Sequence, residues 1–335
     1  MEDPDDDVLA ALLDDEPIPR PRRTGLRIVG ATLLIGLIAL LVFVPGGWLN
    51  DRGSSAAVHP TTTATDATSV TAATLAEHPE GRRLTAEDWR LQVGATVLIG
   101  AVQPDCAGMI TSIAGRRYIT SARHCLTDVL EKDVVSPEPG QVQEITGRTF
   151  DTFHVFDLVS HQRLATLDRI GVGTGDLDVL VATTKDESSA FRARPARTLD
   201  QAPRVGDEVA TFAASAASGF NPQRLTGVFL GSYAFHDDTG HSYDMDLTGY
   251  RQASSAALVG PGHSGSSPTG AGGSAFGPLL FSLNQGTTAK LRAEELHNMG
   301  AATGLDLASE GFVGLDETLH LTPKDYLRFD VLLQG

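Results

Sequence analysis

Positive charge is scarce in this sequence. Its 26 lysine and arginine residues are outnumbered by 42 aspartate and glutamate residues, and the formal net charge is −16 at pH 7. A surface that binds nucleic acid needs basic side chains to neutralise phosphates, so the composition argues against nucleic acid as a partner. Residues 1–27 hold eight acids and four arginines, which leaves −12 on the rest of the chain. We interpret this acidity as ordinary solubility.

Motifs that bind metals or cofactors are also lacking. One group of side chains suits a metal in composition but has no zinc-type spacing: His236, Asp237, Asp238, His241 and Asp244. The letters DDTG within this group lie between two β-like runs and fit a hairpin turn better. The glycine strings GVGTG and GAGG lack the helix that a phosphate-binding loop requires. The sequence therefore predicts neither a metal site nor a cofactor.

Only one long apolar run is present. Residues 28–44 contain no charged side chain, and Trp48 follows at a depth suited to the membrane interface. Four arginines precede the run closely and only Arg52 follows it, so the positive-inside rule predicts that the acidic tail at 1–27 is cytoplasmic and that the rest of the chain is outside. We therefore expect a single transmembrane helix at 28–49. A cleaved signal peptide is the alternative, since small residues follow at 54–57.

The remainder of the chain changes character twice. Residues 50–83 are rich in serine, threonine and alanine, a composition that cannot bury enough surface to fold, and we expect a linker there. From 84 to 335 the sequence shows short β-like runs separated by turn residues, such as VGATVLIGAV, LDVLVAT and RLTGVFLGSYAF. This pattern predicts an all-β domain. Two helices are expected beside it, at 290–297 and at 323–333 after an N-cap at Thr322.

Three short segments carry residue types suited to nucleophilic catalysis. His124 ends a strand-like run (YITSARHCL), Asp176 precedes an apolar one (GDLDVLVA), and Ser264 lies between glycines (GHSG). A serine hydroxyl becomes a nucleophile when an imidazole removes its proton, and a carboxylate must hold that imidazole in the correct tautomer. Asp178 is the alternative carboxylate, because in a strand it would share a face with Asp176.

In the chain order His124, Asp176, Ser264, at offsets of 52 and 88 residues, these segments resemble the chymotrypsin-type (trypsin-like) serine proteases over roughly residues 95–281. The whole chain resembles a membrane-anchored member of bacterial type. The resemblance implies two six-stranded antiparallel β-barrels followed by a C-terminal helix. Asp176 is preferred over Asp178 because it matches the family's aspartate at the start of a strand.

The resemblance also implies several features of the site. The backbone N–H groups of Gly262 and Ser264 would form the oxyanion hole, and Leu258, six residues before the serine, would form the floor of the specificity pocket. An apolar floor implies cleavage after a small or apolar residue. Cys106 and Cys125 reproduce a pair that is bonded in the family. Two free thiols are the alternative, but export to an oxidising compartment favours the disulfide.

The chain departs from the family around the nucleophile, where GHSGSSP replaces GDSGGP. Two functions therefore stay open. The retained triad predicts a serine endopeptidase, anchored in the cell membrane with its protease domain outside, that cuts protein or peptide substrates through an acyl-enzyme. The altered loop leaves as the alternative a catalytically inactive protease fold that serves as a binding or sensing module on a membrane tether.

Overall fold

The structure, a computed structural model, describes the body of the protein. By its internal contacts the chain divides into two units, residues 1–60 and 61–335. All described residues belong to the second unit. They are 81–126, 140–147, 149–175, 177–198, 203–213, 219, 222–236, 242–250, 264–271, 277–283 and 314–334.

Three expected segments fall outside this range, and the linker expected at 50–83 is described only from residue 81. The acidic tail at 1–27 and the transmembrane helix at 28–49 lie outside the described residues, as does the helix expected at 290–297. Within the described part of the chain, no helix is both long enough and apolar enough to cross a membrane. Membrane attachment therefore stays a prediction from the sequence.

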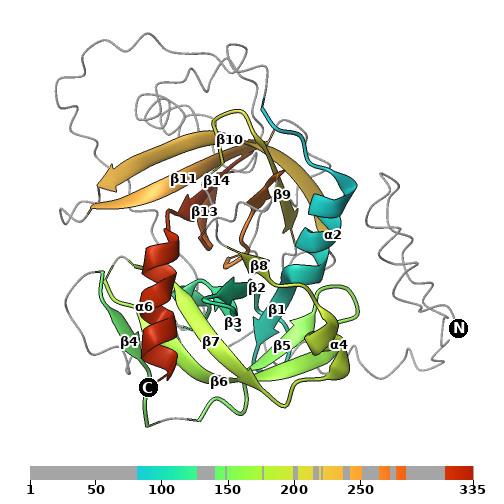
Figure 1. Cartoon of the computed structure of the whole chain (residues 1–335), viewed down its shortest axis with the longest axis vertical. Coiled ribbons are helices and arrows are strands. Elements are labelled where there is room, and N and C mark those ends of the chain that lie inside the picture. The colour runs from blue at the N-terminus through green and yellow to red at the C-terminus, as the bar shows by residue number, and fades with distance from the viewer. Residues whose placement is uncertain are drawn as a thin grey trace, which may run out of the picture. The chain divides into compact units, whose positions relative to one another are not determined.

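A closed barrel of six antiparallel strands forms the first part of the fold (Figure 1). β1 pairs with both β2 and β5, so the strand order β1-β5-β6-β7-β3-β2 returns to its start and leaves no free edge. Two short strands extend it, β4 beside β6 and β8 parallel to β2. The strands are β1 (Thr96–Gly100), β2 (Cys106–Ile113), β3 (Arg116–Ser121), β4 (Val142–Glu144), β5 (His154–Asp157), β6 (Arg163–Gly173), β7 (Leu180–Lys185) and β8 (Arg197–Thr198).

Apolar side chains of these strands fill the barrel. Alternate strand residues point to the same face, so Val97 and Ile99 of β1 both enter one core cluster. Each large apolar side chain that is fully buried contributes about 1.5–3 kcal/mol to stability. Other buried members of the cluster come from six elements: Ile110, Ile119, Val155, Leu164, Leu167, Ile170, Val172, Leu180 and Phe191.

A second sheet of six strands follows, in the order β12-β9-β10-β11-β14-β13. Strands β10 and β11 form a long hairpin in which His236 pairs with Ser242, as expected around the letters DDTG. None of the described pairings joins β12 to β13, so the described residues show one closed barrel and one six-stranded sheet, and the second expected barrel is not shown as closed. The strands are β9 (Glu208–Ala213), β10 (Gln223–His236), β11 (Ser242–Tyr250), β12 (Thr269–Gly270), β13 (Leu279–Leu283) and β14 (Gly314–Leu319).

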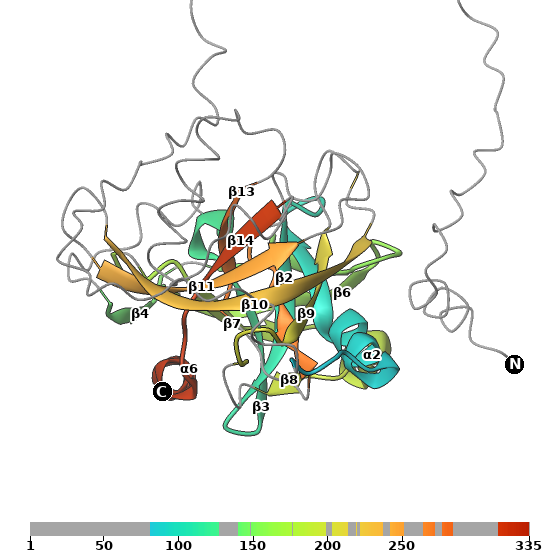
Figure 2. The ribbon, with the colours of Figure 1, turned by 90° about the horizontal axis from the view of Figure 1, so that it is seen from above.

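Two helices flank the sheets on opposite sides in both ribbon views (Figures 1 and 2). The helix α2 (Ala86–Ala95) precedes β1 and is not predicted by the sequence analysis. The helix α6 (Pro323–Gln334) confirms the expected C-terminal helix, and Thr322 and Asp325 form its reciprocal N-cap. Shorter helical turns are η3 (Arg123–Leu126) and α4 (Ser189–Ala193).

The C-terminal helix packs on a core to which both sheets contribute. Phe329 of α6 is buried with Tyr118 and Val181 of the barrel and Met245 of the second sheet. Asp330 is also buried and accepts a hydrogen bond from the Tyr118 hydroxyl at 2.6 Å. Burial and the neighbouring Asp330 carboxylate raise the pKa of Tyr118 to about 12. These contacts join the barrel to the second sheet. The two parts contribute different residues to the site.

Candidate active site

His124 lies three residues after the end of β3. The last four residues of this strand are buried, Ala122 is fully buried, and the chain then turns into η3. The side chain of His124 is 39% exposed. Its backbone is therefore held at the end of the barrel while its imidazole stays accessible to an incoming molecule.

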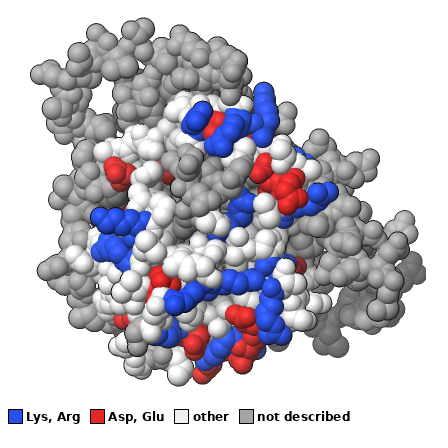
Figure 3. All heavy atoms as spheres, viewed as in Figure 1, with Lys and Arg blue, Asp and Glu red and all other residues white. Residues whose placement is uncertain are grey.

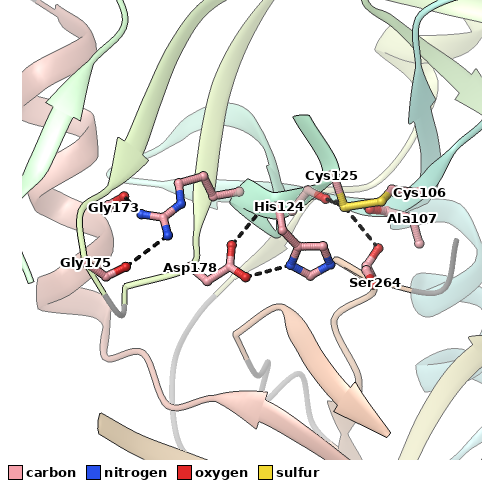
Figure 4. Close-up of polar contacts among 10 residues, drawn as sticks. Cys106, Ala107, His124, Cys125, Gly173, Gly175, Asp178 and Ser264 are labelled. Carbon is pink, nitrogen blue, oxygen red and sulfur yellow. Dashed lines mark hydrogen bonds and ion pairs between the residues drawn. A yellow bond between two sulfur atoms is a disulfide. The ribbon is translucent and has the colours of Figure 1, made fainter. Parts of the chain in front are cut away.

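Both carboxylate oxygens of Asp178 contact His124 (Figure 4). Oδ1 accepts a hydrogen bond from the backbone N–H of His124 at 2.9 Å, and Oδ2 lies 2.6 Å from the ring Nδ1. An ionised carboxylate can only accept, so Nδ1 carries the proton and Nε2 is left as an acceptor. A neutral imidazole in this tautomer can take a proton from a hydroxyl.

The partners of Asp178 favour its ionised form. Burial raises the pKa of this carboxyl, but the hydrogen bonds and charge of His124 and the charge of Arg123 lower it more, so the net pKa lies below its ordinary value. The group is consequently a carboxylate at neutral pH. A carboxylate in this position stabilises a positive charge on the imidazole.

Arg123 holds the loop that carries Asp178. Its guanidinium donates hydrogen bonds to the carbonyl oxygens of Gly173 at 2.6 Å and Gly175 at 2.9 Å. The loop is tightly folded, because a Cβ on Gly173 would lie only 2.0 Å from the carbonyl oxygen of Leu177. Only glycine allows this close approach. The orientation of Asp178 is thus fixed by the residue that precedes His124.

The carboxylate in contact with His124 is the alternative one from the sequence analysis. Asp176, the preferred residue, lies outside the described residues. That preference assumed a strand that begins directly after Asp176, whereas β7 begins at Leu180 and the N–H of Leu177 bonds to Thr174 in a turn. Asp178 therefore takes the place of Asp176 as the candidate orienting residue.

Backbone contacts of Ser264 hold this residue near His124. Its carbonyl oxygen accepts a hydrogen bond from the N–H of Ala107 at 3.0 Å. The same oxygen lies 3.6 Å from Sγ of Cys125, the residue that follows His124. Figure 4 shows the imidazole between Asp178 and Ser264. The histidine and the serine predicted from the sequence are therefore brought together.

Gly265 determines how the chain leaves Ser264. Its φ is +81°, in the left-handed region that favours glycine. A Cβ at this position would lie 2.0 Å from Oγ of Ser121 and 2.5 Å from the carbonyl oxygen of Ala107. The backbone of this loop therefore packs against the start of β2 and the end of β3. The end of β3 lies three residues before His124.

The disulfide between Cys106 and Cys125 is confirmed. It joins the start of β2 to η3, with the two Cα atoms 5.9 Å apart. Cys125 follows His124, and Ala107, which follows Cys106, binds the carbonyl oxygen of Ser264. The crosslink therefore ties the segment of the histidine to the strand that holds the serine.

The other expected site residues are not described. Gly262, expected as an oxyanion donor, and Leu258, expected as the floor of the specificity pocket, both lie outside the described residues. Among the residues that are described, no three His, Cys, Asp or Glu side chains gather as a metal site. Charged side chains of both signs are interspersed over the face in Figure 3. The absence of nucleic acid as a partner stays a prediction.

Two contributors to the site were missed or ranked second by the sequence analysis. No sequence motif identifies Arg123. Its guanidinium binds two backbone carbonyl groups, and these come near it only in the folded loop. Asp178 had a signal, since the glycine string at 171–175 indicates a tight loop rather than an immediate strand. The strand β6 indeed ends within that string, at Gly173.

Comparisons with known proteins find similar solved structures but no similar sequence. No protein-family model matches the chain, and no curated protein resembles it in sequence. One similar structure is AL20, a thermostable serine protease from an extremophilic microorganism (12% identity, 71% of this chain and 95% of that chain, TM-score 0.40). Another is the inactive form of Rv3671c from M. tuberculosis H37Rv, with a serine replaced by alanine (14%, 63% and 88%, 0.38). A third is kallikrein-related peptidase 10 (10%, 73% and 98%, 0.42). At identities this low, the activities of these proteins cannot be assigned to this chain.

Proposed function

We propose that this protein is a serine endopeptidase that hydrolyses peptide bonds through His124, Asp178 and Ser264. The observation that carries the proposal is the pair of contacts from Asp178 to the ring and the backbone of His124. A carboxylate with both contacts fixes the tautomer and the orientation of the ring. The hydrogen bond from Ala107 to Ser264 supports the same assignment, because it keeps the serine at the end of the barrel where the histidine lies.

In the proposed mechanism, Nε2 of His124 takes the proton of the Ser264 hydroxyl while Oγ attacks the carbonyl carbon of the peptide bond. Asp178 balances the charge of the resulting imidazolium. His124 then donates its proton to the leaving amine, the C–N bond breaks, and an acyl-enzyme remains on Ser264. A water molecule that loses a proton to His124 hydrolyses this ester and restores the free serine.

The developing oxyanion needs donors, and we assign this function to the backbone N–H groups of Gly262 and Ser264. The glycines on both sides of the serine support the assignment, since they let the backbone turn sharply there. One such donor contributes about 10²–10³ in rate. We assign Leu258 to the floor of the specificity pocket, so the expected substrates are proteins or peptides cut after a small or apolar residue.

We further propose that the protease domain is anchored outside the cell membrane by a helix at 28–49. The uncharged run at 28–44 has four arginines just before it and only Arg52 after it, and this asymmetry supports the orientation. The disulfide between Cys106 and Cys125 supports it independently, because such bonds persist in oxidising compartments.

An inactive binding or sensing module on the same tether is the second candidate. The observation in its favour is the replacement of GDSGGP by GHSGSSP around Ser264. Covalent labelling separates the two candidates, because a fluorophosphonate probe reacts with a serine only when a base activates it.

We expect a fluorophosphonate probe to label the full-length wild type and to label neither Ser264→Ala nor His124→Ala. Ser267→Ala is the matched control. Ser267 lies three residues further in the same buried segment, and its hydroxyl makes no hydrogen bond to any described residue, so its loss should leave labelling unchanged. A folded, oxidised wild type that is not labelled would contradict the hydrolase and favour the binding module. Labelling that persists in Ser264→Ala would move the nucleophile elsewhere.

A further inference from the structure

A buried side chain of α2 contacts the segment that follows Ser264. Gln92 is only 1% exposed. Its Nε2 donates a hydrogen bond to the carbonyl oxygen of Ser267 at 3.1 Å, and its Oε1 accepts one from the Thr269 hydroxyl at 2.6 Å. Both ends of this amide are therefore used on residues three and five positions after the serine.

The segment that Gln92 holds is enclosed on its other side as well. Ser267 and Thr269 are both almost fully buried. β12 pairs with β9 so that Thr269 lies opposite Ala210. The segment thus runs between α2 and β9. Gln92 therefore satisfies two buried polar groups of this segment, the carbonyl oxygen of Ser267 and the hydroxyl of Thr269.

The helix α2 is itself firmly attached to the second sheet. Thr85 and Asp88 form a capping box at its N-terminus. The buried ring of Trp89 packs edge-on against Phe212 of β9, with 5.6 Å between ring centroids. The guanidinium of Arg224 in β10 lies 4.1 Å from the centroid of the same ring. The helix that holds the serine segment is therefore a rigid support.

The residues ahead of α2 strengthen this attachment. The backbone N–H of Arg82 donates to the carboxylate of Asp207 at 2.8 Å, and its guanidinium pairs with the same group at 3.1 Å. The N–H of Leu84 donates to Glu208 at 2.8 Å. Burial raises the pKa of Asp207, but hydrogen bonds from the backbone of Arg204 and Arg82 lower it more. This buried group is thus a carboxylate at neutral pH.

We infer that Gln92 is a positioning residue for Ser264, an inference that rests on the proposed function. Only Gly265 and Ser266 separate Ser264 from the residue that Gln92 holds, and both are buried. Gly265 fits its backbone closely against Ser121, so the segment has one well-packed position. Loss of the contacts with Gln92 would let the segment leave this position and move Ser264 with it. A misplacement of about 1 Å at a reacting atom costs roughly 100-fold in rate.

The decisive variant is Gln92→Met, which keeps the length of the side chain and removes both hydrogen bonds. The carbonyl oxygen of Ser267 and the hydroxyl of Thr269 would then be buried without their partner, and the segment would shift to find others. We expect the rate constant of fluorophosphonate labelling at saturating probe to fall at least about tenfold. If Gln92 only stabilised the fold, Gln92→Met would lower the fraction of the protein that is labelled. The labelling rate constant of the folded molecules would then stay unchanged.

Two further variants keep the result interpretable. Thr269→Val removes one of the two hydrogen bonds with little change of volume, and we expect a fall of about threefold in the labelling rate constant. It decides the question if Gln92→Met does not fold. Arg90→Met is the matched control, since Arg90 lies on the exposed face of the same helix and pairs only loosely with Glu87, at 3.6 Å. Its labelling rate constant should stay within about twofold of the wild type.

Hydrogen exchange of the full-length protein monitors the segment at 264–270 and does not depend on catalytic activity. We expect faster exchange of the amides at 264–270 in Gln92→Met than in Arg90→Met. If the wild type is not labelled, the proposed function fails, and exchange alone decides whether Gln92 holds the segment. If the wild type is labelled, a labelling rate constant in Gln92→Met equal to that of Arg90→Met overturns the inference, and so does unchanged exchange.

Discussion

The closed barrel and the second sheet contribute to the candidate site in different ways. The barrel provides His124 and Asp178 from the ends of the neighbouring strands β3 and β7, where Ser121 pairs with Leu180. Antiparallel pairing at that point brings the residues after one strand beside the residues before the other. Ser264 instead comes from the connection between β11 and β12, and contacts with separate elements fix its place.

This difference separates two kinds of preorganisation. The base and the carboxylate are held together by the hydrogen-bonded ladder of a single barrel, so a change in the carboxylate should affect chemistry and leave the fold intact. The serine is held by close packing and a few polar contacts between barrel, helix and second sheet. Changes around it should therefore affect stability and chemistry together.

The largest effect is expected for Asp178→Asn, which keeps the shape of the side chain and removes its charge. The amide can donate to Nδ1 of His124 and favour the wrong tautomer, so the labelling rate constant should fall about 10³–10⁴-fold. Asp176→Asn is the control and should change it less than about twofold, since Asp178 already occupies both donors of His124. Melting temperatures should show both variants folded. A larger loss in Asp176→Asn would return the orienting function to the residue first preferred.

Gly265→Ala tests the close packing around the serine. The new Cβ would meet Ser121 and Ala107 at distances that no structure tolerates, and φ is positive, so we expect a loss of about 3–4 kcal/mol in the free energy of unfolding and no labelling. Gly115→Ala is the matched control, because φ there is +79° but nothing lies within 4 Å of the added atom. Urea unfolding should show that it loses only about 1 kcal/mol. Equal losses in the two variants would mean that backbone conformation, and not packing, makes glycine necessary.

Replacement of both cysteines, Cys106→Ala with Cys125→Ala, tests the crosslink that joins the histidine segment to β2. A loop of 19 residues predicts a loss of about 3 kcal/mol in the free energy of unfolding. Urea unfolding of the wild type with and without reductant should give the same difference. An oxidised wild type no more stable than the double variant would show that the β-ladder alone fixes the barrel end.

Glu317→Gln tests the second sheet through its pH dependence. Glu317 in β14 is buried, and burial raises its pKa to about 7. Its folded-state pKa lies above that of the unfolded chain, so the stability it contributes is fully present below about pH 4.5 and is lost as pH rises through about 7. The free energy of unfolding of Glu317→Gln, relative to the wild type, should therefore increase by about 3 kcal/mol between pH 4.5 and pH 8. A difference that does not vary with pH would mean that this carboxyl is solvated.

The sequence was most informative where the determinants are local. The strand-like run before His124 marked the end of β3, and the N-cap residue Thr322 marked the start of α6. The helix α2 also has an N-cap signal, the pair Thr85 and Asp88. The apolar run that begins at Val93, however, indicates a strand from its first residue. The strand β1 begins only at Thr96.

The glycine string at 171–175 indicates a loop, but the strand pattern that follows it does not distinguish the two aspartates. Both precede apolar residues, and alternation along a strand would place both on one face. The decision depends on the turn before β7, which is set by the close approach of Gly173 to Leu177 and by the hydrogen bonds of Arg123. Contacts of this kind link residues that carry no joint signal in the sequence. Gln92 belongs to the same class, since its partners lie 175 and 177 positions away.

The order of contacts along the N-terminal segment determines how the fold would respond to mechanical tension. A pull on the chain ahead of Gly81 reaches the protein first at the ion pair between Arg82 and Asp207 and then at α2. These attachments lie in series, so they would yield one after another before load reached the ladder of the barrel. Tension from this side would therefore loosen the support of Ser264 while His124 and Asp178 remained paired.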